Sequence, residues 1–303
     1  MNKELRELFD EHHIITKKIT IKKNARIIET NDKKFVIKKR DENLNNLFKY
    51  LKSRSFTYYP EIIYQTKHYD IYEYIKDVEI DPQERANDLM KLVSLLHNKT
   101  TFYKEIDDNT YKELYENTIN RIEYLEHYYN DLADIIEQEE FMSPSNYYFS
   151  RNITKVFHSL NYAKYHIEKW YSILEEKKRI RIVHIHNNLK LEHYLLSDKP
   201  YLISWRHSKK DLPIFDLIKL YKEYHNKLDF YELLRIYETN YSLLKEERIL
   251  FFVLISIPDK IELNDSEYNM CKKIDNFYQY LSSSEKLIND YLPKEKAPQT
   301  TTN

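Results

Sequence analysis

The chain contains no glycine among its 303 residues. An ordinary protein has about 7% glycine. Glycine adopts left-handed backbone conformations without steric cost and lets a backbone approach a phosphate closely. Glycine-rich dinucleotide turns, P-loops and nucleophile elbows all depend on these properties. The sequence therefore excludes each of these sites in its usual form, and we expect asparagine and aspartate at the tight turns.

Charge and hydropathy limit the partners that the chain can have. With 48 basic and 49 acidic residues, the net charge gives no electrostatic reason to expect a nucleic-acid partner. The longest apolar run, Ile249–Ile257, is far shorter than a bilayer span. The N-terminus lacks the apolar stretch of a signal peptide, and the single cysteine, Cys271, indicates a reducing compartment. We expect a cytoplasmic protein with no nucleic-acid or membrane partner and with a protein partner that the sequence does not identify.

The first 77 residues show the pattern of a small sheet with two helices. Apolar residues at helical spacing alternate along the chain with β-branched runs of period two. The predicted elements are a helix over 3–12, two or three antiparallel strands over 17–39, a helix over 40–53, and strands over 61–66 and 69–74. We place a hairpin at Asn31-Asp32, because both residue types tolerate left-handed turn geometry.

The remainder of the chain is predicted to be mostly helical. A helix starts at Asp81-Pro82, and apolar residues recur every three or four positions over 115–136 and over 149–174, the latter started by Ser143-Pro144. One β-rich island interrupts the helices, with strands predicted over 180–185, 194–196 and 201–203. The polar segment 294–303 is predicted to be a disordered tail. These patterns together predict an α+β fold.

Short motifs follow one another in a fixed order around the β-rich island. They read His186-Asn187-Asn188-Leu189-Lys190-Leu191-Glu192-His193, then Ile203-Ser204-Trp205, then Pro213-Ile214-Phe215-Asp216-Leu217. Upstream stand Val36-Ile37-Lys38, Tyr72-Glu73-Tyr74-Ile75 and Leu95-Leu96-His97-Asn98-Lys99-Thr100. In order and spacing this set resembles the kinase-like superfamily, specifically the aminoglycoside phosphotransferase and choline kinase type and its bacterial spore-coat kinase-like branch.

The resemblance implies a two-lobed protein-kinase-like fold. It places a small antiparallel-sheet N-lobe over 1–77, a mainly helical C-lobe over 78–293 and the tail over 294–303. His186 and Asp216 stand where the family has structural residues. We therefore expect both of them to hold backbone groups in place.

The resemblance also implies a nucleotide site in the N-lobe. Lys38 stands at the strand lysine that pairs with nucleotide phosphates, and Glu73 and Tyr74 stand at the hinge between the lobes. The helix partner of Lys38 would be Glu42. The plain alternative is that Lys38 is one of several solvated cations at the end of a strand.

Three positions depart from the family pattern, and all three concern catalysis. Asn188 stands at the position of the catalytic aspartate, and an amide cannot accept the proton of a substrate hydroxyl. His193 and Ser204 stand at the two metal-binding positions, although Mg²⁺ prefers oxygen ligands and usually a carboxylate. Phosphoryl transfer depends on positioning and on charge neutralisation. We therefore expect no cofactor, with ATP and magnesium only if activity or nucleotide binding is retained.

These departures leave three hypotheses. The leading one is a catalytically degenerate kinase-like protein, a pseudokinase, that acts as a binding or scaffold component and is associated with the spore coat. The second is an active ATP-dependent small-molecule phosphotransferase with atypical residues, using Asp198 or Asp211. The third is a zinc site formed by His184, His186 and His193, whose imidazoles follow one strand.

Overall fold

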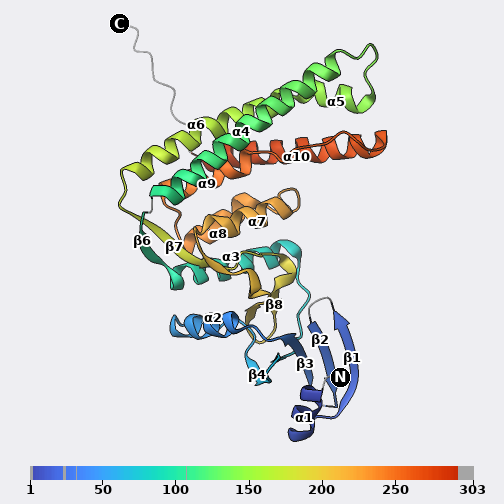
Figure 1. The fold of residues 1–303 in the computed structure, drawn as a ribbon, viewed down its shortest axis with the longest axis vertical. Coiled ribbons are helices and arrows are strands. Elements are labelled where there is room, and N and C mark those ends of the chain that lie inside the picture. Colours follow the sequence, from blue (N-terminus) through green and yellow to red (C-terminus); the bar gives the residue numbers. More distant parts are fainter. Residues whose placement is uncertain (1–2, 23–24, 32, 107, 293–303) are drawn as a thin grey trace. The chain divides into compact units, whose positions relative to one another are not determined.

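The computed structural model describes residues 3–22, 25–31, 33–106 and 108–292 (Figure 1). The chain divides into two compact units. Unit 1 comprises residues 1–85 and 188–208, and unit 2 comprises residues 86–187 and 209–303. Residues 188–208, which the sequence analysis assigns to the C-terminal lobe, thus group with unit 1. The predicted tail over 294–303 lies outside the described residues.

Unit 1 is built on a five-stranded antiparallel sheet with the strand order β1-β2-β3-β5-β4. Its first elements are α1 (Lys3–Glu11), β1 (Thr16–Lys22), β2 (Ala25–Thr30), β3 (Lys34–Lys39), α2 (Glu42–Ser53), β4 (Ile62–Gln65) and β5 (Tyr69–Glu73). Residues 188–208 add two short 3₁₀ turns, η1 (Leu191–His193) and η2 (Trp205–His207), and the hairpin of β8 (Tyr194–Leu196) and β9 (Pro200–Leu202). The predicted α+β character is confirmed. The predicted hairpin at Asn31-Asp32 includes Asp32, which is outside the described residues.

One face of this sheet packs against α1 and forms a core. Six buried residues from α1, β2, β3 and β5 make up the cluster: Leu5, Phe9, Ile28, Phe35, Ile37 and Ile71. Successive side chains on a strand point to opposite faces. Because Ile37 belongs to this core, its neighbour Lys38 points to the other face of the sheet.

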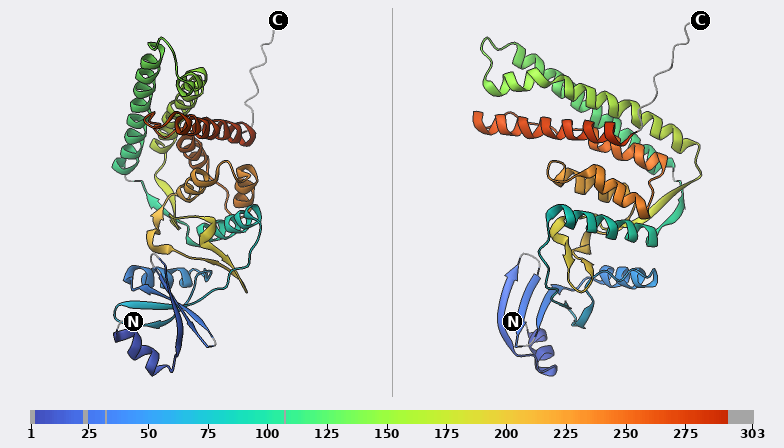
Figure 2. Two further views of the ribbon diagram at one scale, coloured as in Figure 1. Left: turned by 90° about the vertical axis from the view of Figure 1, so that its right-hand side faces the viewer. Right: turned by 180° about the vertical axis from the view of Figure 1, so that it is seen from behind.

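Unit 2 is mainly helical. Its helices are α3 (Pro82–Thr100), whose first turn belongs to unit 1, α4 (Asp108–Glu137), α5 (Pro144–Asn152), α6 (Thr154–Glu175), α7 (Ile214–Tyr224), α8 (Phe230–Asn240), α9 (Lys245–Ser256) and α10 (Glu267–Tyr291). A three-stranded sheet contains β6 (Phe102–Glu105), β7 (Arg179–Ile185) and β10 (Lys209–Asp211), in the order β10-β7-β6. The long helix α6 packs against both α4 and α10 (Figure 2). Across the described ranges, every helix is too short or too polar to cross a membrane.

The helix predicted over 149–174 is divided in two in the structure. α5 ends at Asn152 and α6 begins at Thr154. The side-chain amide of Asn152 donates to the carbonyl oxygen of Tyr148 (3.1 Å), a local bond of the kind by which asparagine competes with helical hydrogen bonding. Ile153 keeps helical dihedral angles (φ −60°, ψ −27°). The apolar rhythm therefore continues across the break, and periodicity alone could not reveal it.

Candidate functional site

Lys38 lies on the face of the sheet opposite the α1 core, near the end of β3. It is paired across the sheet with Asp70 of β5, and its Nζ lies 5.7 Å from the centre of the Tyr72 ring. Burial lowers the pKa of Lys38, and the charge of Arg206 lowers it further. Among the described residues, no carboxylate lies within ion-pair distance of its ammonium group. Lys38 is therefore a half-buried cation without an acidic partner.

The helix partner expected for Lys38 does not take that role in the structure. Glu42 is exposed at the start of α2. The carboxylate at this junction belongs instead to Asp41, the N-cap of α2, which accepts a hydrogen bond from the Asn43 backbone N–H (3.1 Å). The second oxygen of Asp41 lies 3.9 Å from Nε of Arg206. The acidic group near β3 thus contacts an arginine that the motif analysis did not single out.

Asn188 and His193 are joined by a hydrogen bond within their loop. Nδ1 of His193 donates to the backbone carbonyl oxygen of Asn188 (2.6 Å). Burial lowers the pKa of His193. The Asn188 carbonyl and Glu192 oppose this shift, while Lys190 and Lys38 add to it. The imidazole is therefore neutral at pH 7, and its Nδ1 is occupied by the loop.

Ser204 has a left-handed backbone conformation (φ 70°) immediately before η2. The following residue, Trp205, is buried, and its indole N–H donates to the carbonyl oxygen of Leu202 (2.6 Å). The Trp205 ring also meets Phe48 of α2 and Phe56 edge-on, at centroid distances of 6.4 and 6.1 Å. Trp205 thus fixes the positions of its two sequence neighbours, Ser204 and Arg206, beside α2.

Glu73 and Tyr74 lie at the end of β5 and are exposed. The backbone N–H of Tyr74 donates to the carbonyl oxygen of Lys34 (3.0 Å), which extends the pairing with β3 by one residue. The ammonium of Lys34 lies 5.8 Å from the Tyr74 ring centre. Glu73 forms no ion pair with another described residue, so the predicted hinge positions offer an exposed carboxylate and an exposed aromatic ring.

Asp216 organises the start of the loop from within unit 2. Its Oδ2 accepts the backbone N–H of His186 (2.8 Å), and its Oδ1 accepts that of Asn187 (2.6 Å). Nε2 of His97 donates to Oδ2 (3.1 Å), and Nδ1 of His97 lies 2.7 Å from the Tyr237 hydroxyl. Burial alone would raise the pKa of Asp216, but His97 and His186 outweigh it, so this pKa is lowered. Asp216 is therefore an ionised buried acceptor for the loop backbone.

The helix-end motif has a structural role that its sequence did not reveal. His97 contacts Asp216, as described above. Three residues later, the hydroxyl of Thr100 accepts the backbone N–H of His184 (3.1 Å) and donates to the carbonyl oxygen of Leu96 (2.7 Å). The motif at the end of α3 thus contacts both β7 and the N-terminal turn of α7.

Within unit 1, the charge of Arg206 lowers the pKa of Lys38, and the charge of Lys38 lowers the pKa of His193. His193 is also hydrogen-bonded to the Asn188 carbonyl oxygen. Arg206 was not predicted as a site residue from the sequence. The sequence feature that could have pointed to Arg206 is its position directly after the Ile203-Ser204-Trp205 motif.

The residues at the metal-binding positions do not fit magnesium. His193 and Ser204 offer a neutral imidazole and a hydroxyl, whereas Mg²⁺ requires near-octahedral oxygen ligands and is usually bound through carboxylates. In the part of the chain that the structure describes, no three His, Cys, Asp or Glu residues are grouped so as to hold a metal ion. The zinc hypothesis with His184 and His186 therefore finds no ligand cluster either.

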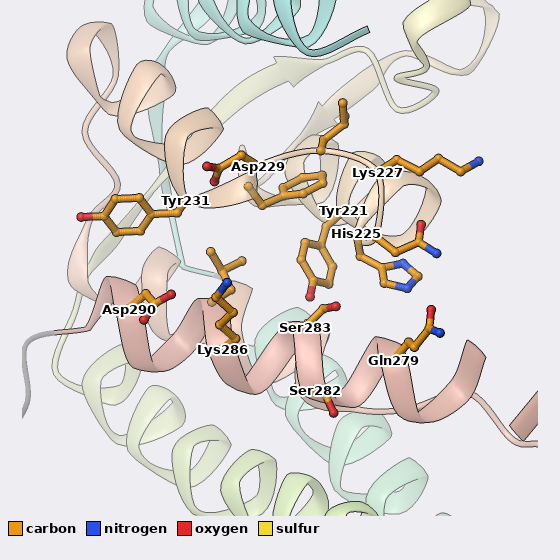
Figure 3. Close-up of a pocket in the computed structure, with 14 residues that line it drawn as sticks. Tyr221, His225, Lys227, Asp229, Tyr231, Gln279, Ser282, Ser283, Lys286 and Asp290 are labelled. Atoms are coloured by element: carbon orange, nitrogen blue, oxygen red, sulfur yellow. The ribbon is translucent and has the colours of Figure 1, made fainter. Parts of the chain in front are cut away.

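A separate hollow in unit 2 contains none of the predicted site residues (Figure 3). Its volume is about 950 Å³, and it lies between the α7–α8 connection and α10. His225 extends into it next to Tyr280, with ring centres 4.9 Å apart, and burial lowers the pKa of His225. The lining carries both Lys286 and Asp290. Because cations and anions both line the hollow, its chemistry does not select one class of ligand.

Comparison with solved structures identifies the fold. An aminoglycoside phosphotransferase from Alicyclobacillus acidocaldarius matches with a TM-score of 0.65 at 8% identity, covering 91% of this chain and 92% of that one. A spectinomycin phosphotransferase solved with AMP matches with a TM-score of 0.52 at 16% identity, covering 93% and 98%. A choline kinase from Streptococcus pneumoniae gives a TM-score of 0.49 at 15% identity, covering 96% and 99%. No protein-family model and no curated protein sequence matches the chain.

The chain therefore has a kinase-like phosphotransferase fold of the aminoglycoside phosphotransferase type. The predicted fold class, with an antiparallel-sheet N-terminal part and a mostly helical C-terminal part, is confirmed. At 8 and 16% sequence identity, the similarity to these structures lies in the backbone fold and not in the side chains. Activity has to be argued from the side chains.

Proposed function

We propose that this protein is a pseudokinase, a kinase-like protein that does not transfer phosphoryl groups and acts as a binding or scaffold component. The observation that carries the proposal is the chemistry at three positions, Asn188, His193 and Ser204. Each of them lacks a carboxylate. One such replacement would impair catalysis, and the three together remove both the base and the metal ligands that the reaction uses.

The local contacts support this reading of the three positions. Nδ1 of His193 is occupied by the Asn188 carbonyl, so the imidazole serves the conformation of its own loop. Asn188 cannot accept a proton at neutral pH, because an amide oxygen is only weakly basic. Ser204 is neutral, and the cation Arg206 follows it two positions later in the chain. A positive neighbourhood disfavours a divalent cation.

The active-phosphotransferase alternative gains no support from its candidate acids. Asp198 accepts a hydrogen bond from the Tyr201 hydroxyl (3.1 Å) at the β8–β9 turn. Asp211 pairs with Lys209 (2.6 Å) and accepts the backbone N–H of Leu212 (2.8 Å). Both carboxylates are engaged in local contacts within their own units. The association with the spore coat stays a prediction of the sequence resemblance.

The proposal is tested by a search for turnover. The purified chain is incubated with ATP and Mg²⁺, alone and with a panel of amino alcohols and sugars, and ADP formation is measured. We expect no ADP above the protein-free background. The matched control is Lys38→Ala, because a contaminating kinase gives the same rate in both preparations. Turnover that is present in the natural chain and lost in Lys38→Ala would refute the proposal.

A further inference from the structure

β1 carries exposed isoleucines at one edge of the sheet in unit 1 (Figure 1). In the strand order β1 comes first, and among the described strands it pairs with β2 alone. Ile19 is 44% exposed and Ile21 is 76% exposed. An edge strand of this kind has a row of backbone donors and acceptors available for pairing with another chain. β1 thus combines an open backbone edge with exposed apolar side chains.

The two isoleucines extend the core of unit 1 to the edge of the sheet. Ile19 is directly opposite Ile28 of β2, and directly opposed side chains lie on the same face. Ile28 belongs to the core that packs against α1, whereas that core includes no residue of β1. Ile21 is on the same face as Ile19, because side chains alternate along a strand. Lys38 is on the opposite face, so the isoleucines are separate from the candidate functional site.

The other face of β1 is basic. Lys18 and Lys22 are exposed and alternate with the isoleucines, so they are on the opposite face. Lys18 is opposite Glu29 of β2, but the Glu29 carboxylate also lies 2.5 Å from the ammonium group of Lys34. The sequence of β1 itself contains lysines and no acidic residue. The strand therefore has one apolar face and one positively charged face.

We propose that β1 binds an extended segment of a partner protein in which apolar and acidic residues alternate. The segment adds to the sheet as a further strand, and its backbone pairs with the open edge of β1. Its apolar side chains lie beside Ile19 and Ile21, and its carboxylates lie beside Lys18 and Lys22 on the other face. The inference goes beyond the proposed function, because it holds whether or not the chain transfers phosphoryl groups.

The lysines argue against a second copy of this chain as the added strand. Pairing of two β1 strands would bring the lysines of both copies together without an acidic residue from either strand. Like charges that face each other across strands destabilise the pairing, whereas opposite charges stabilise it. The charge of β1 therefore disfavours self-association and favours an acidic partner, and specific interfaces commonly discriminate in this way.

The probe is a fluorescein-labelled peptide, Glu-Val-Glu-Val-Glu-Val-Glu, titrated with the full chain and followed by fluorescence anisotropy. We expect saturable binding that weakens as salt is added, and no binding of the peptide with lysine in place of glutamate. Ile21→Thr should weaken binding by about fivefold, because it removes apolar contact area and keeps a β-branched residue. Lys22→Gln should weaken it by about threefold, because it removes a cross-strand charge pair.

The matched controls are on the opposite edge of the same sheet. Ile63→Thr changes an isoleucine of β4 that is 41% exposed, and Lys67→Gln changes an exposed lysine of the β4–β5 turn. Both variants should keep the affinity of the natural chain.

Backbone pairing is tested with two further peptides, one N-methylated at its valines and one at its glutamates. Alternate residues of a strand direct their N–H groups to opposite edges. One of the two peptides should therefore lose binding, and the other should retain it. Equal affinities of both for the chain would show that no strand is added.

Other results would also overturn the inference. One is no peptide binding by a chain whose circular dichroism and melting temperature are normal. Another is equal weakening by Ile21→Thr and Ile63→Thr, which would show an unspecific apolar effect. Dimers in analytical ultracentrifugation that Ile21→Thr abolishes would assign the edge to a second copy. Binding to phosphatidylserine vesicles without binding to the peptide would assign it to a membrane surface.

Discussion

At the scale of single residues, polar residues adopt the left-handed backbone conformations that glycine usually adopts. Among the described residues, positive φ angles occur at His13, Ser55, Asn187 and Ser204. Asparagine visits this region at a lower cost than most residues, because its short polar side chain can hydrogen-bond locally. Asn187, which precedes Asn188 in the loop, has a φ of 58°. The loop conformation that glycine usually permits is therefore available to this chain.

His184 makes the stability of the fold dependent on pH. Burial lowers the pKa of His184 to about 4, with Lys210 and His97 acting in the same direction and Asp216 against it. In the unfolded chain the pKa is near 6.5. Between pH 6.5 and 4 the unfolded state therefore binds a proton that the folded state does not, so stability is full above pH 6.5 and falls as the pH is lowered.

We expect this single group to cost about 2 kcal/mol of unfolding free energy between pH 7 and pH 5. The measurement is urea unfolding of the natural chain, of His184→Gln and of the exposed-site control His158→Gln. His184→Gln should remove that part of the decline, and His158→Gln should retain it. An identical decline in all three proteins would show that His184 does not carry the effect.

At the scale of elements, Asp216 joins parts of unit 2 that are far apart in the sequence. It contacts His97 of α3 and the backbone that follows β7, and it lies in the first turn of α7. Lys219, one turn later in α7, donates to the carbonyl oxygen of Asn187 (2.6 Å). The conformation of the loop start thus depends on three elements at once.

Asp216→Asn should destabilise the fold by about 3 kcal/mol, because it leaves buried donors without their ionised acceptor. The matched control is Asp198→Asn, at the exposed β8–β9 turn, where a change within about 0.5 kcal/mol is expected. Urea unfolding at pH 7, followed by circular dichroism, measures both. Equal stabilities of the two variants would contradict the anchoring role of Asp216.

The long elements could be predicted from the sequence, because their apolar periods are sustained. The strand over 180–185 and the helix from Pro82 are examples. The short strands β6 and β10 could not be predicted. Lys209, Lys210 and Asp211 carry no β pattern of their own and become a strand by pairing with β7, which is a tertiary effect.

The site residues could be predicted only in part, because some of their roles depend on tertiary contacts. Asn188, His193 and Ser204 are recognisable because short motifs surround them. The role of His97 depends on Asp216, 119 positions away, and that of Arg206 depends on the fold bringing Asp41 close to it. A local sequence pattern cannot predict contacts between residues so far apart in the chain.

At the scale of the whole molecule, the chain has a phosphotransferase fold, and we propose that its side chains do not support the reaction. The fold likeness extends over 91% of the chain at 8% identity. The buried contacts around Asp216 and Trp205 maintain the backbone of the loop and of the turn that follows it. These contacts are structural and do not depend on catalytic activity. The proposed function therefore depends on the claim that the chain lacks magnesium ligands.

Calorimetric titration of ATP into the chain at increasing Mg²⁺ concentrations tests this claim most directly. The reference is the triple variant Asn188→Asp, His193→Asn and Ser204→Asp, which restores the family's oxygen ligands. We expect that Mg²⁺ does not increase the affinity of the natural chain for ATP and does increase that of the triple variant. An affinity of the natural chain that rises with Mg²⁺ would show that the chain does hold magnesium.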